Sequence, residues 1–200
     1  MVCLKTTYIN WGIMKKYITL YENTFSSEDC KNIIKKFEDS SSLHEVESIT
    51  ASDGWHMQFT QIKLANHEVF EEENKKLRAL FLEAISAYKK EHGIETHQWP
   101  QKFNLEPIRM KRYLPDSEDM FDAHVEVTNL ETARRFMVAF IYLNDDFAGG
   151  ETDFPQFKIM VKPKQGNMLL FPAMWNWLHK GYPVQGENPK YIVGTIMHYV

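Results

Sequence analysis

Cysteine is scarce in this sequence, with only Cys3 and Cys30 among 200 residues. Two thiols are too few for a disulfide framework, so the fold is expected to form without one. The first residues also lack the basic-then-apolar order of a signal peptide. Both absences favour a reducing, cytoplasmic setting.

Long apolar runs and strong positive charge are absent as well. No stretch approaches the roughly 18 uninterrupted apolar residues of a membrane-spanning helix, so no membrane partner is expected. The formal net charge is −4, and no run of lysine and arginine stands out. A duplex nucleic-acid partner is therefore disfavoured, because its phosphates require a basic surface.

The composition that is present suits one globular domain with a real core. Hydrophobic residues make up 44% of the chain, and repeats, low-complexity tracts and linkers are missing. Phe, Trp and Tyr account for 14%, which favours strands in that core. The simplest prediction is a single domain over residues 1–200.

Helical patterns occupy the first half of the chain and strand patterns the second. Ser26 and Ser27 are typical helix caps, and a helix is expected over 27–39. A second helix is expected over about 67–92, followed by Gly93 as a stop. Asp53-Gly54 indicates a hairpin within 43–64. Further strands are expected at 106–114, 121–128, 134–143, 157–162, 167–171 and 190–199.

These elements predict an α+β, mainly β fold, with a β-sandwich or jelly roll and helices packed outside. We expect residues 1–105 to form a helical support region, preceded by an edge strand within Ile9–Tyr21. Residues 106–200 would form the catalytic β-core.

The stretch Phe121–Val127 carries the first chemical signal. If it is a strand, His124 and Glu126 project to the same face. Two histidines and one carboxylate form the ligand set of non-haem Fe(II) oxygenases, and His179 is the candidate for the third ligand. Alone, a His-x-Glu pair is more typical of a solvated strand edge, so the interpretation depends on the sequence that follows the pair.

Several short motifs follow the pair in a fixed order. An apolar strand preceded by Arg135 ends in Tyr142-Leu143-Asn144. A Gly149-Gly-Glu-Thr152 turn and a Pro-Lys-Gln-Gly166 turn into Leu-Leu-Phe171 come next, and then His179-Lys-Gly-Tyr-Pro-Val184 and Lys190. This ordered set resembles the prolyl-4-hydroxylase-like branch of the Fe(II)/2-oxoglutarate-dependent oxygenases. The resemblance covers roughly residues 106–200.

The resemblance implies a double-stranded β-helix, or jelly-roll, core with two supporting N-terminal helices. It implies iron binding by His124, Glu126 and His179. Lys190 would pair with the distal carboxylate of 2-oxoglutarate, with Tyr142 and Tyr113 beside the cosubstrate. The role of Arg135 stays open at this point. The implied activity is an Fe(II)-, 2-oxoglutarate- and O2-dependent dioxygenase that hydroxylates an unactivated C–H bond and releases succinate and CO2.

One departure from the family concerns the carboxylate ligand, which is Glu126 where the family usually has aspartate. The extra methylene moves the carboxylate by roughly 1.5 Å at full extension. Glu126 can still ligate, and Asp122, with the same strand parity as His124, is an alternative ligand. We also expect the Lys190 amine to lack a protein partner when no cosubstrate is bound.

The substrate is less well defined by the sequence. A prolyl residue in a peptide or protein is the family-based expectation, and a free amino acid or another small metabolite is the alternative. A nucleobase demethylase is disfavoured, because a basic surface and that branch's arginine-rich C-terminal signature are missing. A rival of another class is a catalytically inactive jelly-roll binding protein, which only Glu126 favours.

Overall fold

The computed structural model describes residues 17–200, so part of the edge strand expected within Ile9–Tyr21 lies outside the described residues. Two α-helices and fourteen strands are formed in this range. Their bounds are β1 Thr19–Tyr21, α2 Ser27–Asp39, β2 Glu45–Thr50, β3 His56–Lys63, α3 Glu71–Glu91, β4 Phe103–Leu105, β5 Arg109–Tyr113, β6 Met120–His124, β7 Arg135–Tyr142, β8 Ala148–Gly149, β9 Thr152–Phe154, β10 Ile159–Val161, β11 Met168–Pro172, β12 His179–Gly181, β13 Val184–Gln185 and β14 Lys190–Tyr199.

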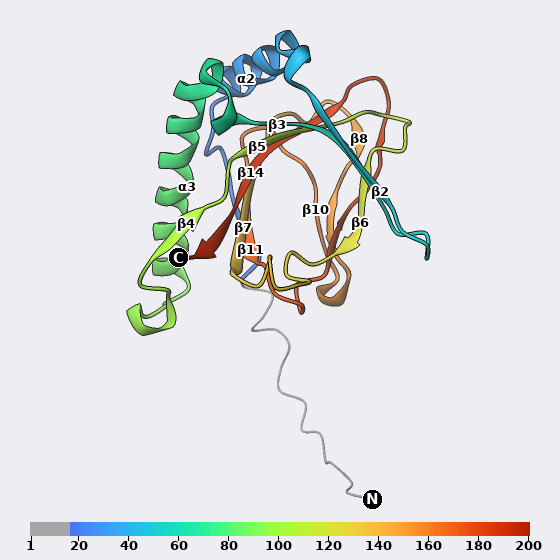
Figure 1. Ribbon diagram of the computed structural model, residues 1–200. Coiled ribbons are helices and arrows are strands. Elements are labelled where there is room, and N and C mark those ends of the chain that lie inside the picture. The colour runs from blue at the N-terminus through green and yellow to red at the C-terminus, as the bar shows by residue number, and fades with distance from the viewer. Residues whose placement is uncertain (1–16) are drawn as a thin grey trace, which may run out of the picture.

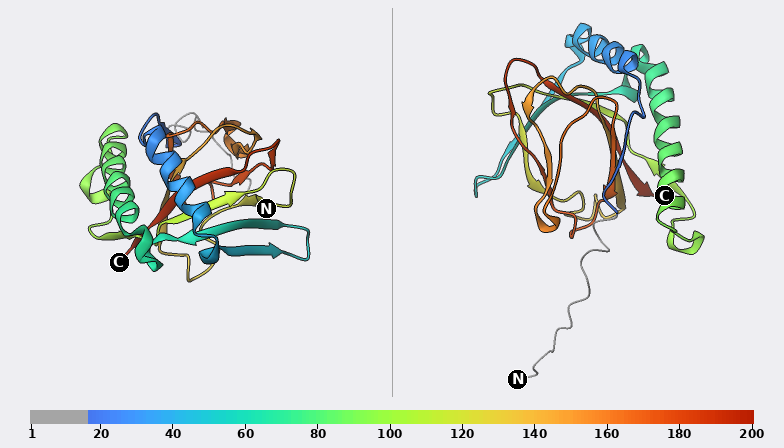
Figure 2. Two further views of the ribbon diagram at one scale, coloured as in Figure 1. Left: turned by 90° about the horizontal axis from the view of Figure 1, so that it is seen from above. Right: turned by 180° about the vertical axis from the view of Figure 1, so that it is seen from behind.

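Most strands belong to one antiparallel sheet that curls around a central space (Figures 1 and 2). Its order is β1-β11-β7-β14-β5-β3-β6-β12-β9-β10, with β2 paired to β3 and β4 to β14. Neighbours in this order are often far apart in the chain, as when β14 lies between β7 and β5. This non-consecutive order in a curled antiparallel sheet confirms the predicted jelly-roll core.

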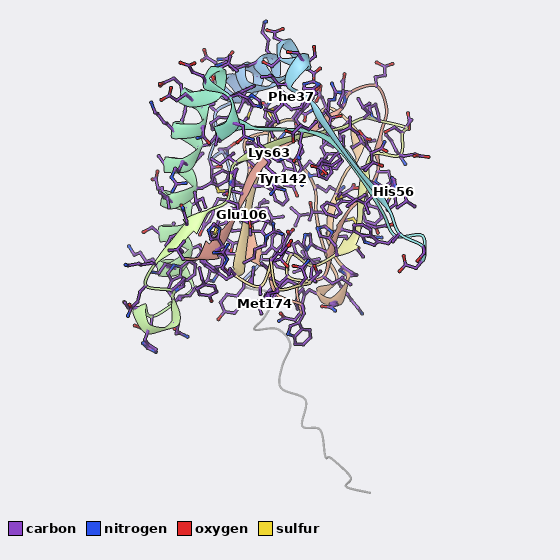
Figure 3. All side chains as sticks on the ribbon, in the orientation of Figure 1. Phe37, His56, Lys63, Glu106, Tyr142 and Met174 are labelled. Carbon is purple, nitrogen blue, oxygen red and sulfur yellow. The ribbon has the colours of Figure 1, made fainter. Side chains whose placement is uncertain are left out.

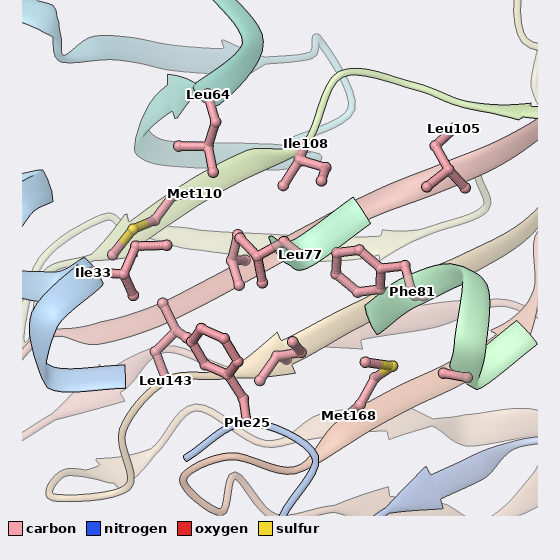
Figure 4. Packing of buried hydrophobic residues seen from close by; sticks show 14 of the residues in the cluster. Phe25, Ile33, Leu64, Leu77, Phe81, Leu105, Ile108, Met110, Leu143 and Met168 are labelled. Atoms are coloured by element: carbon pink, nitrogen blue, oxygen red, sulfur yellow. The ribbon is translucent and has the colours of Figure 1, made fainter. Parts of the chain in front are cut away.

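The helices cover the outside of the barrel on the side of β5, β7 and β14 (Figure 1). Helix α2 begins where the Ser26 hydroxyl accepts the backbone N–H of Asp29, the cap that the sequence predicts. Its inward face buries Ile33 and Phe37, and helix α3 buries Leu77 and other residues at helical spacing. Figure 4 shows Ile33 and Leu77 packed with residues of the sheet such as Met110, as expected for supporting helices.

The β2–β3 hairpin belongs to the sheet although it comes from the first half of the chain. It forms around the predicted Asp53-Gly54 turn, and Gly54 has a positive φ of 89°. Strand β3 then pairs with both β5 and β6. Residues 1–105 therefore contribute strands to the core as well as helices.

Two predicted boundaries differ most from the structure. Helix α3 begins at Glu71, after two 3₁₀ turns, and not near His67. Strand β6 ends at His124, so Glu126 lies in a bend beyond the strand. Neither α-helix within residues 17–200 is long and apolar enough to cross a membrane.

Candidate metal centre and cosubstrate pocket

Three side chains from two distant segments of the sequence meet at one wall of the barrel. His124 ends β6, His179 begins β12, and the two residues are direct partners in the β6–β12 pairing. Their Nε2 atoms lie 3.5 Å and 3.6 Å from the same Oε1 of Glu126. Donors bound at about 2.1 Å to one cation are separated by about 3.0 to 3.6 Å, so these distances suit a shared metal ion. The three predicted ligands are therefore brought together.

Both imidazoles are held in the orientation that a metal ligand needs. Nδ1 of His124 lies 2.8 Å from the carbonyl oxygen of Asp122, and Nδ1 of His179 lies 2.9 Å from that of Trp177. A carbonyl only accepts, so each Nδ1 carries a hydrogen, and each Nε2 faces the position where a metal ion would bind. Burial and the neighbouring His179 lower the pKa of His124, which keeps its ring neutral near pH 7.

Arg135, whose role the sequence left open, holds the carboxylate ligand. Its Nη1 donates to the Glu126 carbonyl oxygen at 3.3 Å and lies 3.5 Å from Glu126 Oε2. Its Nε and Nη2 donate to the two carboxylate oxygens of Glu106, at 2.7 Å and 3.0 Å. Glu126 lies beyond the end of β6 and is not held by strand pairing, so the contacts with Arg135 position it. Burial alone would raise the pKa of Glu126, but His124 and His179 lower it well below its ordinary value.

We expect Arg135→Met to weaken Fe(II) binding by about 10- to 100-fold, the usual cost of losing a group that orients a metal ligand. Competition with a chromophoric chelator would measure the affinity. Arg112→Met is the matched control, because Arg112 also pairs with a glutamate, Glu38, but lies outside the metal centre. Equal affinities of the Arg135 variant and the unmodified protein would contradict a positioning role.

The β2–β3 hairpin also helps to hold the ring of His124, through Phe121. The Phe121 ring stacks on His124 with centroids 3.5 Å apart and planes 5° from parallel. Trp55, at the hairpin tip, packs edge-on against Phe121, and its Nε1 donates to the carbonyl oxygen of Ala123. The first half of the chain thus supports the metal centre directly, which the sequence did not predict.

Asp122, the alternative carboxylate ligand, serves the same hairpin. Its Oδ2 accepts the backbone N–H of His56 at 3.0 Å, and it is not one of the three residues whose donor atoms converge. The alternative that Asp122 replaces Glu126 is therefore not supported. Figure 3 shows His56 on the hairpin that lies along β6.

Lys190 and the two predicted tyrosines form a separate group at the same cavity. Lys190 is only 4% exposed. Its amine lies 5.3 Å from the ring centroid of Tyr113 and 5.7 Å from that of Tyr142. Burial lowers the pKa of Lys190 to about 8. The expectation that this amine lacks a protein partner is wrong, because it donates to the carbonyl oxygen of Gly150 at 2.6 Å.

A cavity of about 270 Å³ joins the two groups and is lined by five of the six predicted site residues, all except Tyr142. The sequence interpretation missed two further residues that line it, Thr152 and Lys111. The Thr152 hydroxyl lies 2.8 Å from that of Tyr142, whose ring is inside the barrel (Figure 3). Lys111 precedes Tyr113 by two positions on β5, so strand alternation could have placed both on the inner face.

Comparison with known proteins supports the same interpretation. Residues 108–198 match the family model described as the 2OG-Fe(II) oxygenase superfamily. The "Putative prolyl 4-hydroxylase" of Acanthamoeba polyphaga mimivirus is 30% identical over 88 residues, which are 40% of this chain and 36% of that protein. The matched segment is thus little more than a third of that relative's length.

Solved structures share the fold across nearly the whole chain. The viral collagen prolyl hydroxylase vCPH from Paramecium Bursaria Chlorella virus-1, in its 2OG complex, gives a TM-score of 0.63 at 23% identity, covering 94% of this chain and 99% of that one. A Trichoplax adhaerens prolyl hydroxylase, in complex with a hypoxia inducible factor peptide fragment, gives 0.68 at 11% identity, covering 91% and 83%. At these identities the likeness concerns the fold.

The segment that matches the family model contains the three converging ligands, Tyr113 and Lys190 of the cavity, and Tyr142. Its curled antiparallel sheet is the jelly roll of the solved relatives. Residues 108–198 thus match the 2OG-Fe(II) oxygenase superfamily in the same segment that holds the candidate metal ligands and Lys190.

Proposed function

We propose that the chain is an Fe(II)- and 2-oxoglutarate-dependent dioxygenase that hydroxylates a prolyl residue of a peptide or protein. The observation that carries the proposal is the pairing of two features in one cavity. The two histidine Nε2 atoms and a Glu126 oxygen converge within 4.8 Å of one another. Lys190, a buried cation, lines the same cavity and suits the distal end of a dicarboxylate.

The donor set fits Fe(II), which accepts imidazole and carboxylate ligands and has positions left for other groups. When bound, iron and 2-oxoglutarate supply an oxidative decarboxylation in which O2, 2-oxoglutarate and a substrate C–H give succinate, CO2 and an alcohol. His124, Glu126 and His179 would hold the metal. Lys190 would orient the cosubstrate, and the surrounding aromatic rings would exclude water from the site.

Anaerobic titration with Fe(II) and 2-oxoglutarate tests this proposal. We expect a weak visible absorption band that needs both components, and slow succinate formation once air is admitted without substrate. A screen of proline-containing peptides, free amino acids and nucleosides, with detection of a mass gain of one oxygen, would then identify the substrate class. A folded protein that gives neither the band nor succinate would favour the inactive binding protein instead.

Two proteins of similar fold support a peptide substrate. One is a collagen prolyl hydroxylase, and the other is a prolyl hydroxylase in complex with a peptide fragment. Hydroxylation of a free amino acid or another small metabolite is the second candidate, which a cavity of about 270 Å³ also suits. We further propose one domain over residues 1–200 and a cytoplasmic location. The free thiol of the buried Cys30 is consistent with that location.

A further inference from the structure

Lys111 is a second lysine in the cavity, and neither the metal centre nor the cosubstrate group uses it. It lies on β5 opposite Ile192 of β14, one inward-facing position away from Tyr113. Its amine lies 4.0 Å from the ring centroid of Phe59 and 5.4 Å from that of Phe121. Phe121 in turn stacks on His124, so the Lys111 amine lies on the metal side of the cavity.

The amine of Lys111 has no ionic partner of its own. Within residues 17–200 it makes no hydrogen bond and no ion pair, and it lies close to the two aromatic rings. The other cations of the cavity differ. Arg135 and Arg109 share the carboxylate of Glu106, and Lys190 donates to a backbone carbonyl oxygen.

This isolation has an energetic cost that a ligand can remove. Burial lowers the pKa of Lys111 to about 8, and Glu126 is the acidic group that opposes this most strongly. Metal binding would engage the charge of Glu126, and 2-oxoglutarate would bring its distal carboxylate to Lys190. Both events leave the charge of Lys111 without a counter-ion next to the reacting centre. A cation over aromatic rings is favourable, but it does not replace a hydrogen-bonded anion.

We propose that Lys111 binds a carboxylate of the substrate, so that the enzyme selects substrates with a carboxylate close to the carbon that is oxidised. This inference rests on the proposed dioxygenase function and specifies its substrate class. The carboxylate could be the free α-carboxylate of an amino acid or chain end, or the side chain of an acidic residue beside the target. The chemistry at Lys111 is the same for both sources.

Two matched pairs of probes separate the two sources of the carboxylate. One pair is N-acetylproline and its amide, and the other is acetyl-Gly-Pro-Glu-Gly-amide and its glutamine counterpart. Binding to the anaerobic Fe(II)- and 2-oxoglutarate-loaded protein would be measured by titration calorimetry, and turnover by the mass gain of one oxygen. We expect the carboxylate member of at least one pair to bind about 10- to 100-fold more tightly, as a charge-assisted hydrogen bond allows.

Lys111→Met should abolish that preference by weakening the carboxylate member to the level of its amide, while Lys111→Arg should retain it in part. The matched control is Lys89→Met, which removes a lysine that lies over Trp99, on helix α3 outside the cavity. Equal binding within both pairs, or no binding of any probe, would overturn the proposal. A raised KM for 2-oxoglutarate in the Lys111 variant would overturn it too, by assigning Lys111 to the cosubstrate. Succinate formation without substrate tests the dioxygenase function separately.

Discussion

His179→Ala is expected to lower succinate formation from 2-oxoglutarate by more than about 100-fold. Loss of a residue that only orients a metal ligand costs up to about 100-fold, and loss of the ligand itself should cost more. His179 supplies one of the three converging donors, and its ring lies against those of His124 and Phe171 with centroids 4.2 Å and 4.7 Å away. Equilibrium Fe(II) binding should weaken in parallel with turnover. Both would be measured on the same preparation, by chelator competition and by succinate assay.

Loss of folding must be separated from loss of the ligand, because His179 is only 6% exposed. His179→Gln keeps most of the side-chain volume and a polar end, and should show the same loss with a thermal unfolding midpoint near that of the unmodified protein. His97→Ala, at an exposed position in a 3₁₀ turn, should leave iron binding and turnover unchanged. Full activity of a folded His179→Gln protein would exclude His179 as a ligand.

The sequence predicts the metal centre because each of its two segments, around His124 and around His179, carries a signal in its immediate neighbours. Strand parity put His124 and Glu126 on one face, and the ordered motifs identified His179. The detail of that argument was incomplete, since β6 ends at His124 and Glu126 lies in a bend. The carboxylate reaches the histidines because Arg135 holds it, and Arg135 itself depends on Glu106, 29 residues away. No periodicity in the chain encodes such a long-range pair.

The fold shows the same division between local and long-range information. Helix α2 has the predicted bounds because a cap, acidic residues in its first turn and apolar spacing all agree. The pairing of β3 with β6 was not predicted, because a hairpin sequence does not state which strand it will join. That pairing brings Trp55 against Phe121, whose ring stacks on His124, so the N-terminal half supports the metal centre.

The Gly149-Gly150 turn shows how a motif can be recognised before its reason is known. The sequence offered it as a turn within the family pattern. In the structure Gly150 has a positive φ of 68°, and a Cβ there would lie 2.8 Å from the Phe147 ring and 3.1 Å from Lys190 Cδ. The glycine therefore lets the chain pass close enough for its carbonyl oxygen to accept the Lys190 amine.

Lys190→Met is expected to raise the KM for 2-oxoglutarate by at least about 30-fold, because removing one partner of a buried charge pair costs about 2 to 5 kcal/mol. The protein itself should remain at least as stable. A lysine pKa lowered from 10.5 to about 8 corresponds to a cost of about 3 kcal/mol for the buried charge at neutral pH. Methionine removes that cost, so lost binding would not reflect unfolding. An unchanged KM would remove Lys190 from the cosubstrate site.

The pH dependence gives an independent readout of the same residue. The free enzyme holds Lys190 charged below its pKa of about 8 and neutral above it, so kcat/KM for 2-oxoglutarate should fall about tenfold per pH unit above pH 8. Glu151 opposes this deprotonation, and Lys111, whose pKa is also about 8, favours it. The descending limb should disappear in Lys190→Met and persist in Lys111→Met. If the descending limb is lost in the Lys111 variant instead, the carboxylate of 2-oxoglutarate binds Lys111 and not Lys190. One set of pH profiles therefore tests both assignments.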